Sequence, residues 1–178
     1  MPNYTLESST VETLDGVNLM TRIFKPKQVK DNMVIVLVHQ YSIMGGCQAL
    51  MKGMASGLAD KGYAAVTFDM RGAPIAGSAV DQIEQIIGYV SLGYPFGMMA
   101  SILFGRHHKA ILQSPKPKLF VMGTEDGFTS VKQLDNKLKS AAGHNETRLI
   151  EGAGHFEMEG PAFDAEMVKC ILEFIASL

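Results

Sequence analysis

The sequence predicts a doubly wound α/β fold, with a mostly parallel sheet and an antiparallel hairpin at the amino-terminal edge. From residue 33 onward, short apolar runs typical of strands alternate with segments of helical spacing. Several of these runs show no polar alternation, as expected of parallel strands covered on both faces. The residues before position 27 instead alternate polar and apolar side chains, which is the pattern of a hairpin.

The first half of the chain predicts a hairpin, two buried strands and one helix. Asp15-Gly16 is a turn pair that joins two alternating runs, and Gly62 is a typical stop for the helix before it. The predicted elements are a hairpin of residues 4–14 and 17–24, a strand at 33–38, a helix at 47–59 and a strand at 63–68.

The second half continues the alternation of helices and strands. Pro74 fits the first turn of a helix, and Ser114-Pro115-Lys116-Pro117 separates a loop region from the next strand. The predicted elements are a helix at 73–87, a strand at 89–92, a loop at 93–113 with a helix at 98–104, a strand at 119–122, a helix at 131–142, a strand at 147–150 and a helix at 161–178.

Length and composition favour one ordinary globular domain spanning residues 1–178. A chain of 178 residues buries a substantial core but is short for two domains. With 47% hydrophobic and 19% charged residues it fits neither a disordered nor a fibrous class. The net charge of -2 gives no field to attract nucleic acid or acidic lipid. We therefore expect a small-molecule substrate or ligand as partner, and no cofactor.

The cysteines and the amino terminus favour a reduced compartment. Cys47 and Cys170 do not make a disulfide framework, and no basic segment followed by an apolar one marks a secretory signal. The uncharged segment 86–104 is nearly long enough to span a bilayer, but its glycines and Pro95 favour a buried strand and a pocket-lining loop. We expect a cytoplasmic protein without membrane contact.

Ligands of open α/β sheets bind beyond the carboxyl ends of the strands, where the predicted loops hold His39, Asp69, Asp126 and His155. Asp126 lies in a Gly-Thr-Glu-Asp-Gly turn, and glycines before His155 allow the sharp turn that presents an imidazole. An acid followed by a histidine fits a Ser-Asp-His triad, because the acid fixes the imidazole tautomer. Asp126 and His155 are therefore the candidate catalytic pair. The alternative is a turn-forming aspartate and an ordinary loop histidine.

The segment after the first parallel strand, residues 39–46, is a candidate oxyanion hole. A backbone N–H held beside a helix can stabilise the charge that develops on a tetrahedral intermediate, and Tyr41 is the candidate donor. The alternative is that Gly45 and Gly46 only let the chain enter the helix.

Together these pieces resemble the α/β-hydrolase superfamily, particularly its small, lidless, dienelactone-hydrolase-like members. The likeness covers nearly the whole chain. It rests on the order and spacing of Asp15-Gly16, Val38-His39 with Gly45-Gly46, Gly62-Tyr63, Asp69-Met70-Arg71-Gly72, Gly123-Thr124-Glu125-Asp126 and Gly154-His155-Phe156. The resemblance implies a serine hydrolase acting on ester, thioester or amide bonds, with His155 as base and Asp126 as the acid that orients it.

The sequence departs from that family at the nucleophile. It contains no Gly-x-Ser-x-Gly elbow, and Arg71-Gly72 runs directly into Ala73–Ser78, which resembles the helix that follows the nucleophile. The join looks like an internal deletion of one central αβ unit, roughly thirty residues or more. A skipped exon or a mis-predicted gene model would both produce it. The sheet can still close without that unit, but the repacking predicts marginal stability.

Other residues replace the missing nucleophile poorly. Ser91 is the nearest substitute, but Tyr89 stands where the elbow needs glycine, and Ser42 and Ser78 are better explained as structural. The adjacent His107-His108 point in different directions on a helix and have no third ligand at suitable spacing. They predict a solvated basic patch and no metal site.

Three functional hypotheses remain. The first is a serine-hydrolase relative with little or no activity, in which water activated by His155 gives slow hydrolysis. The second is a non-catalytic module that binds a small molecule or a protein through the Met- and aromatic-rich loop 94–104. The third is a product without function that folds poorly.

Overall fold

The computed structural model describes residues 1–12, 16, 18–38, 48–68 and 80–178. The chain divides into two compact units, one of Met1–Ala73 with Asp164–Val168 and the other of Pro74–Phe163 with Lys169–Leu178. Within the described residues each unit has its own sheet, one of four strands and one of three. Within the described ranges, no helix is long and apolar enough to cross a membrane.

The first unit has the strand order β1-β2-β4-β3, with β1 at Tyr4–Glu12, β2 at Asn18–Pro26, β3 at Val34–Leu37 and β4 at Ala64–Phe68. The predicted hairpin is confirmed, because β1 and β2 pair antiparallel from Tyr4 opposite Pro26 to Glu12 opposite Asn18. In the turn between them, Gly16 has a φ of 79°, a conformation that glycine adopts readily. The parallel part of this sheet is the pair β3 and β4.

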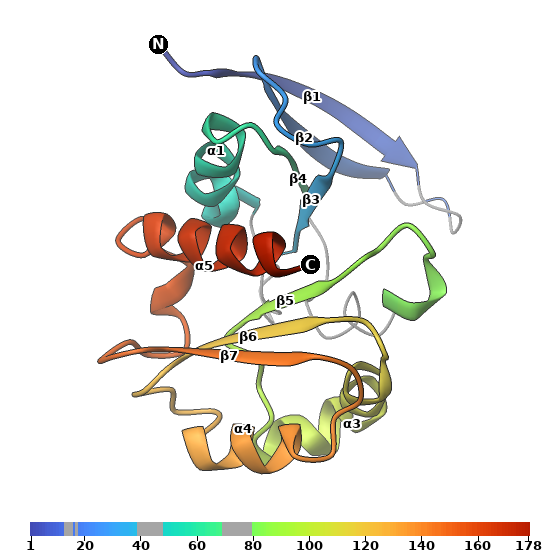
Figure 1. Cartoon of the computed structure of the whole chain (residues 1–178), viewed down its shortest axis with the longest axis vertical. Coiled ribbons are helices and arrows are strands. Elements are labelled where there is room, and N and C mark those ends of the chain that lie inside the picture. Colours follow the sequence, from blue (N-terminus) through green and yellow to red (C-terminus); the bar gives the residue numbers. More distant parts are fainter. Residues whose placement is uncertain (13–15, 17, 39–47, 69–79) are drawn as a thin grey trace. The chain divides into compact units, whose positions relative to one another are not determined.

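One helix packs on this sheet (Figure 1). A 3₁₀ turn, η1 at Gln48–Met51, leads into α1 at Lys52–Asp60, whose Met54 and Leu58 are fully buried. Helix and strand positions agree with the prediction, and Gly62 ends the helix with a φ of 92°. The prediction that β3 is covered on both faces is wrong, since Val34 and Val36 are 53% and 57% exposed.

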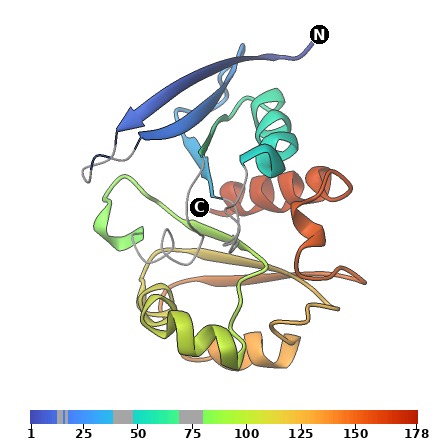
Figure 2. The ribbon, with the colours of Figure 1, turned by 180° about the vertical axis from the view of Figure 1, so that it is seen from behind.

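The second unit is built on a parallel sheet. Its central strand β6, at Lys118–Gly123, is buried along its whole length between β5 at Tyr89–Leu92 and β7 at Asn145–Ile150. Helices α3 and α4 lie on one face of this sheet (Figures 1 and 2). The helical segments are η2 at Val80–Gln82, α3 at Met98–Gln113, α4 at Val131–Leu138, η3 at Glu157–Glu159 and α5 at Asp164–Ser177.

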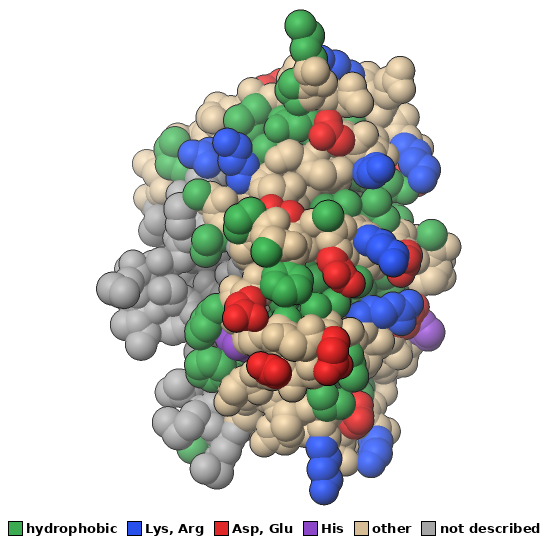
Figure 3. Space-filling model, turned by 90° about the vertical axis from the view of Figure 1, so that its left-hand side faces the viewer, with side chains coloured by type: hydrophobic (Ala, Val, Ile, Leu, Met, Phe, Trp, Pro, Cys, Tyr) green, Lys and Arg blue, Asp and Glu red, His purple; other side chains and the backbone are tan. Residues whose placement is uncertain are grey.

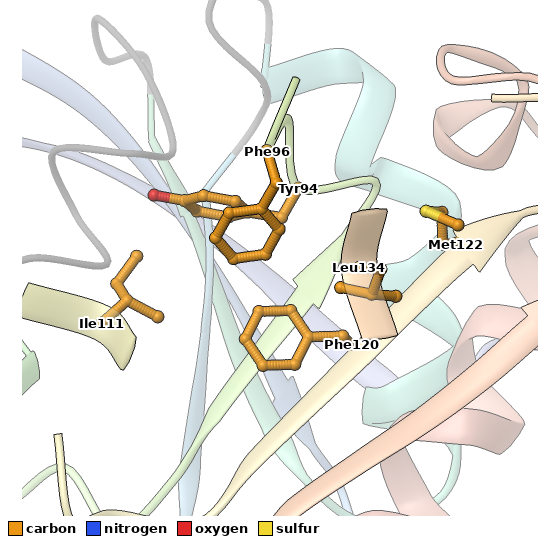
Figure 4. Close-up of a cluster of buried hydrophobic side chains, with 6 residues drawn as sticks. All are labelled: Tyr94, Phe96, Ile111, Phe120, Met122 and Leu134. Carbon is orange, nitrogen blue, oxygen red and sulfur yellow. The ribbon is translucent and has the colours of Figure 1, made fainter. Parts of the chain in front are cut away.

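The core between this sheet and α3 and α4 is strongly aromatic (Figure 4). Two side chains from β6 meet side chains from both helices and from the segment after β5. The six members are Tyr94, Phe96, Ile111, Phe120, Met122 and Leu134. Because side chains of a strand alternate between faces, the other residues of β6 are left to pack on the opposite side of the sheet.

Two predictions in this unit are wrong. Of the predicted helix 73–87, the described part forms only η2, and Ile83 and Ile87 are 44% and 52% exposed, so this part has no buried apolar face to hold a helix. The predicted loop 93–113 is mostly the helix α3. Tyr94 and Phe96, assigned to a ligand-binding loop, lie in the core, 4% and 2% exposed, because their rings pack against Phe120.

The mixed α/β architecture with its amino-terminal hairpin is as predicted, but the strands pair in two sheets. The division falls between β4 and β5 along the chain. This is the place where the resemblance expects a further helix and strand between Gly72 and Ala73. Those two residues lie outside the described part of the chain.

A buried lysine closes the amino end of β6. The Lys118 ammonium group donates to the carbonyl oxygens of Ser114, Lys116 and Ala142 at 2.6, 2.9 and 2.8 Å. Burial lowers the pKa of Lys118, and the negative charge of Asp81 opposes this effect. These bonds join the chain after α3 to the chain after α4, so the start of the central strand is fixed.

Candidate active site

The site forms where β6 and β7 end. The two strands are parallel and in register up to Gly123 opposite Ile150, so the loops that follow them leave the same edge of the sheet. A Cβ atom at Gly123 would lie far inside van der Waals contact with the carbonyl group of Ala153. Glycine at this position therefore allows the second loop to cross directly over the end of the first.

Backbone hydrogen bonds hold the two loops together. The N–H of Thr124 donates to Ile150 O, and the N–H of Glu125 donates to Ala153 O, each at 3.0 Å. The Thr124 hydroxyl oxygen accepts from the N–H of Gly152 at 2.9 Å, and Gly152 makes the bend with a φ of 72°. The loops thus form one rigid platform for the residues that follow.

Asp126 is positioned by a local turn. Its Oδ1 accepts from the backbone N–H groups of Phe128 and Thr129 at 2.7 and 2.9 Å, as is typical of an aspartate that bonds to the backbone ahead of it. The Thr129 hydroxyl accepts from Phe96 N–H at 2.7 Å and donates to Tyr94 O at 3.1 Å. The turn is therefore anchored to the buried segment that follows β5.

The other carboxylate oxygen meets the histidine. Asp126 Oδ2 lies 2.6 Å from His155 Nδ1, and the two side chains are 0% and 8% exposed. Burial raises the pKa of Asp126, but hydrogen bonds from His155 and from the backbone of Thr129 and Phe128 outweigh it, so this pKa lies below its ordinary value. An ionised Asp126 holds the proton on Nδ1, which makes Nε2 the basic nitrogen of the ring.

Two phenylalanines enclose the histidine. The His155 ring lies 4.5 Å from the Phe128 ring and 4.9 Å from the Phe156 ring, and those two rings are 5.5 Å apart in an edge-to-face arrangement. Phe128 and Phe156 are exposed, at 51% and 62%. The site therefore combines a buried hydrogen-bonded pair with an exposed aromatic surface.

The remaining candidate residues are placed as follows. Ser91, the substitute nucleophile, is 5% exposed in β5 and hydrogen bonds with Tyr89, whose pKa is raised by burial to about 12 although this bond opposes the rise. The oxyanion-hole candidate Tyr41 lies outside the described residues. The same holds for His39, Ser42, Cys47, Asp69 and Ser78.

The predicted basic patch at His107-His108 is wrong for His108. That side chain is 4% exposed, because α3 continues through it and turns it toward the aromatic core, where it lies 5.3 Å from the rings of both Tyr94 and Phe96. Burial, with the positive charges of Lys137 and His107, lowers the pKa of His108 to about 4. In the described part of the chain, no group of three potential metal ligands comes together.

The sequence pattern points to Asp126 and His155, which the structure places in hydrogen-bond contact, but not to the groups that orient them. The signal was present in Asp126-Gly-Phe-Thr129, since an aspartate at the start of such a turn commonly accepts from the N–H groups that follow. The aromatic pair around His155 was not predictable, because Phe128 and Phe156 lie in different loops. Their meeting depends on the close approach at Gly123.

Comparison with known proteins supports the fold. No family model and no curated protein matches the sequence. Among solved structures, an α-β serine hydrolase homologue from Coxiella burnetii has a TM-score of 0.73 and 16% identity over 97% of each chain. A Pyrococcus furiosus esterase has a TM-score of 0.73 and 14% identity, over 98% of this chain and 93% of its own.

A third similar structure is the esterase domain of a Rhodothermus marinus protein. Its TM-score is 0.72 at 10% identity, over 94% of this chain and 96% of that domain. All three likenesses span nearly the whole chain at low sequence identity, so they establish the fold. The chain has an α/β-hydrolase-like fold, with an aspartate and a histidine hydrogen-bonded where two of its parallel strands end.

Proposed function

We propose that the chain is a relative of serine hydrolases that act on ester, thioester or amide bonds, and that it has little or no hydrolytic activity because the nucleophile elbow is absent. The observation that carries the family part is the buried pair of Asp126 and His155, joined at 2.6 Å. The observation that carries the loss of activity is the lack of any Gly-x-Ser-x-Gly segment in the 178 residues.

The pair supports a limited chemistry without a serine hydroxyl. Nε2 of His155 accepts a proton from water while the water oxygen bonds to the carbonyl carbon of the substrate. The proton then passes to the leaving alkoxide, thiolate or amine as its bond to carbon breaks. Asp126 stays ionised throughout and stabilises the imidazolium. No covalent acyl intermediate forms on this route, and the rate falls accordingly.

A fluorophosphonate probe tests this proposal. We expect no increase in the intact mass of the chain after exposure to the probe, and only slow hydrolysis of 4-nitrophenyl acetate. His155→Ala should abolish that slow reaction, whereas Leu149→Ala, at an exposed position of β7, should preserve it. Stoichiometric labelling would contradict the proposal. Its loss in Ser91→Ala would then identify Ser91 as the nucleophile.

The encoding transcript tests the origin of the missing segment. If an αβ unit was skipped between Gly72 and Ala73, a longer transcript should encode a helix, a strand and a Gly-x-Ser-x-Gly elbow at that point. The two sheets of the present chain support this origin, because they divide on either side of that position in the sequence. A genome in which the codons for Gly72 and Ala73 are directly joined, with no intervening sequence, would contradict it.

A further inference from the structure

The aromatic side chains around His155 are exposed to an unusual degree. Among the described residues, Phe128 and Phe156 are the only aromatic side chains that are largely exposed, and they contact one another as well as the same histidine. We call these two side chains the aromatic rim. Single exposed apolar residues need no explanation, but two aromatic rings gathered over a buried hydrogen-bonded pair indicate a binding surface.

The aromatic rim stands on a rigid base. Phe128 lies in the turn that Asp126 and Thr129 hold, and a Cβ atom at Gly97 would overlap the Phe128 carbonyl group, so the turn packs directly on the backbone there. Phe156 immediately precedes η3, whose Met158 is fully buried. A ligand that covers these rings therefore does not have to order them first, which favours affinity.

The charges near the aromatic rim are negative. The loop segments 124–130 and 151–160 contain no lysine or arginine. Among their side chains whose burial the structure describes, the exposed acidic ones are Glu125, Glu151 and Glu157. The carboxyl ends of β5, β6 and β7 point to the left in Figure 1, and the face seen from that side carries acidic side chains among hydrophobic ones, together with lysine and arginine side chains elsewhere on it (Figure 3). The acidic side chains of these two loops oppose a ligand with its own carboxylate.

We propose that the aromatic rim binds the apolar, preferably aromatic, group of a neutral carbonyl compound, with the ester or amide placed toward His155, and that anionic acids of the same shape are disfavoured. This inference rests on the proposed function for the position of the carbonyl group. It extends that function by assigning Phe128 and Phe156 as specificity-determining residues. It replaces the loop 94–104, whose residues Tyr94 and Phe96 are buried in the core, as the ligand-binding surface.

Methyl 2-naphthoate and 2-naphthoate are a matched pair of probes, because they differ in charge and share the ring system. The chain contains no tryptophan, so naphthyl fluorescence reports binding directly. We expect the neutral ester to bind at least ten times more tightly than the anion. Phe128→Ala and Phe156→Ala should each weaken ester binding about ten-fold, as the loss of a well-packed aromatic contact does. Leu149→Ala removes a side chain of similar exposure, 46%, and should leave binding unchanged.

Glu125→Gln separates charge from shape. It should tighten binding of 2-naphthoate several-fold and leave the methyl ester unaffected. The inference is overturned if the ester fails to bind, if both phenylalanine variants bind it as the original chain does, or if the anion binds equally well. Rapid hydrolysis through a covalent intermediate that both phenylalanine substitutions still slow would instead contradict only the proposed loss of activity. Slow hydrolysis at a rate that neither phenylalanine substitution changes would contradict only the proposed role of the aromatic rim.

Discussion

Two buried histidines in the second unit have opposite surroundings. His155 lies in a loop at the strand ends, with its Nδ1 bonded to the carboxylate of Asp126. His108 lies in α3 among aromatic rings, and within the described residues neither of its ring nitrogens has a hydrogen-bond partner. The first environment fixes which ring nitrogen carries the proton, and the second disfavours a charge on the ring. Burial alone therefore does not distinguish the two histidines; the partner of the ring nitrogen does.

The largest effect should come from removing the carboxylate partner of His155. Asp126→Ala leaves the N–H groups of Phe128 and Thr129 and the ring of His155 without their acceptor, so we expect a loss of about 3 kcal/mol in the free energy of unfolding. Urea denaturation measures it. Glu125→Ala, at the exposed neighbouring position, should change stability by less than about 0.5 kcal/mol. Equal effects of the two variants would show that the buried pair is unimportant to the fold.

Substitution of a glycine should also have opposite effects in the loops around His155 and in the helix that carries His108. Gly123→Ala should cost about 2 kcal/mol and reduce slow hydrolysis, because the new methyl group would displace the Ala153 backbone that carries the chain toward His155. Gly105, in α3 near His108, has no described atom within 4 Å of an added Cβ. Gly105→Ala should therefore stabilise the chain by about 0.5 kcal/mol through helix propensity. Equal destabilisation by both would contradict the close approach at Gly123.

His108→Phe should stabilise the chain by about 1 kcal/mol, since it removes two buried nitrogens without partners and keeps an aromatic ring in the cluster. Thermal unfolding at neutral pH measures the change. His155→Phe is the matched variant and should be destabilising, because it leaves the Asp126 carboxylate without its ring partner. If His108→Phe lowers the stability more than His155→Phe does, the proposed contrast between the two histidines is wrong.

Stability should fall with acid in two separate windows. The pKa of His108 is about 4 in the folded chain and about 6.5 when exposed, so the unfolded chain takes up the proton more readily. The contribution of neutral His108 to the free energy of unfolding is complete above pH 6.5 and is lost as the pH falls toward 4. The free energy should fall by no more than about 1.4 kcal/mol per pH unit in this range. His108→Phe should remove this slope.

The second window belongs to Asp126. Its pKa is lowered below 3.8 in the folded chain, so the stability that its bonds provide is present above that pH and is lost as the pH falls through the folded pKa. His108→Phe should leave this second loss intact. Unfolding free energies measured from pH 7 to pH 3 in both chains separate the windows. A single transition that is unaffected by the substitution would contradict the assignment.

The sequence predicted the features that local residue patterns determine, and it did not predict the features that tertiary packing determines. The hairpin around Gly16, the buried β6 and the positions of Asp126 and His155 follow from alternation, apolar runs and glycine turns. The full length of α3 and the burial of His108 do not, because the polar residues of this helix are clustered at residues 106–109 and do not mark one solvent face at helical spacing. The exposure of Val34 and Val36 likewise depends on which neighbours a strand has.

Nuclear magnetic resonance of the chain labelled with ¹⁵N-histidine tests the central claim most directly. If Asp126 holds His155 at Nδ1, the His155 Nδ1 proton should give a strongly downfield resonance that disappears in Asp126→Ala, while the His108 resonances stay unchanged. A His155 spectrum that is identical with and without the Asp126 carboxylate would contradict the account.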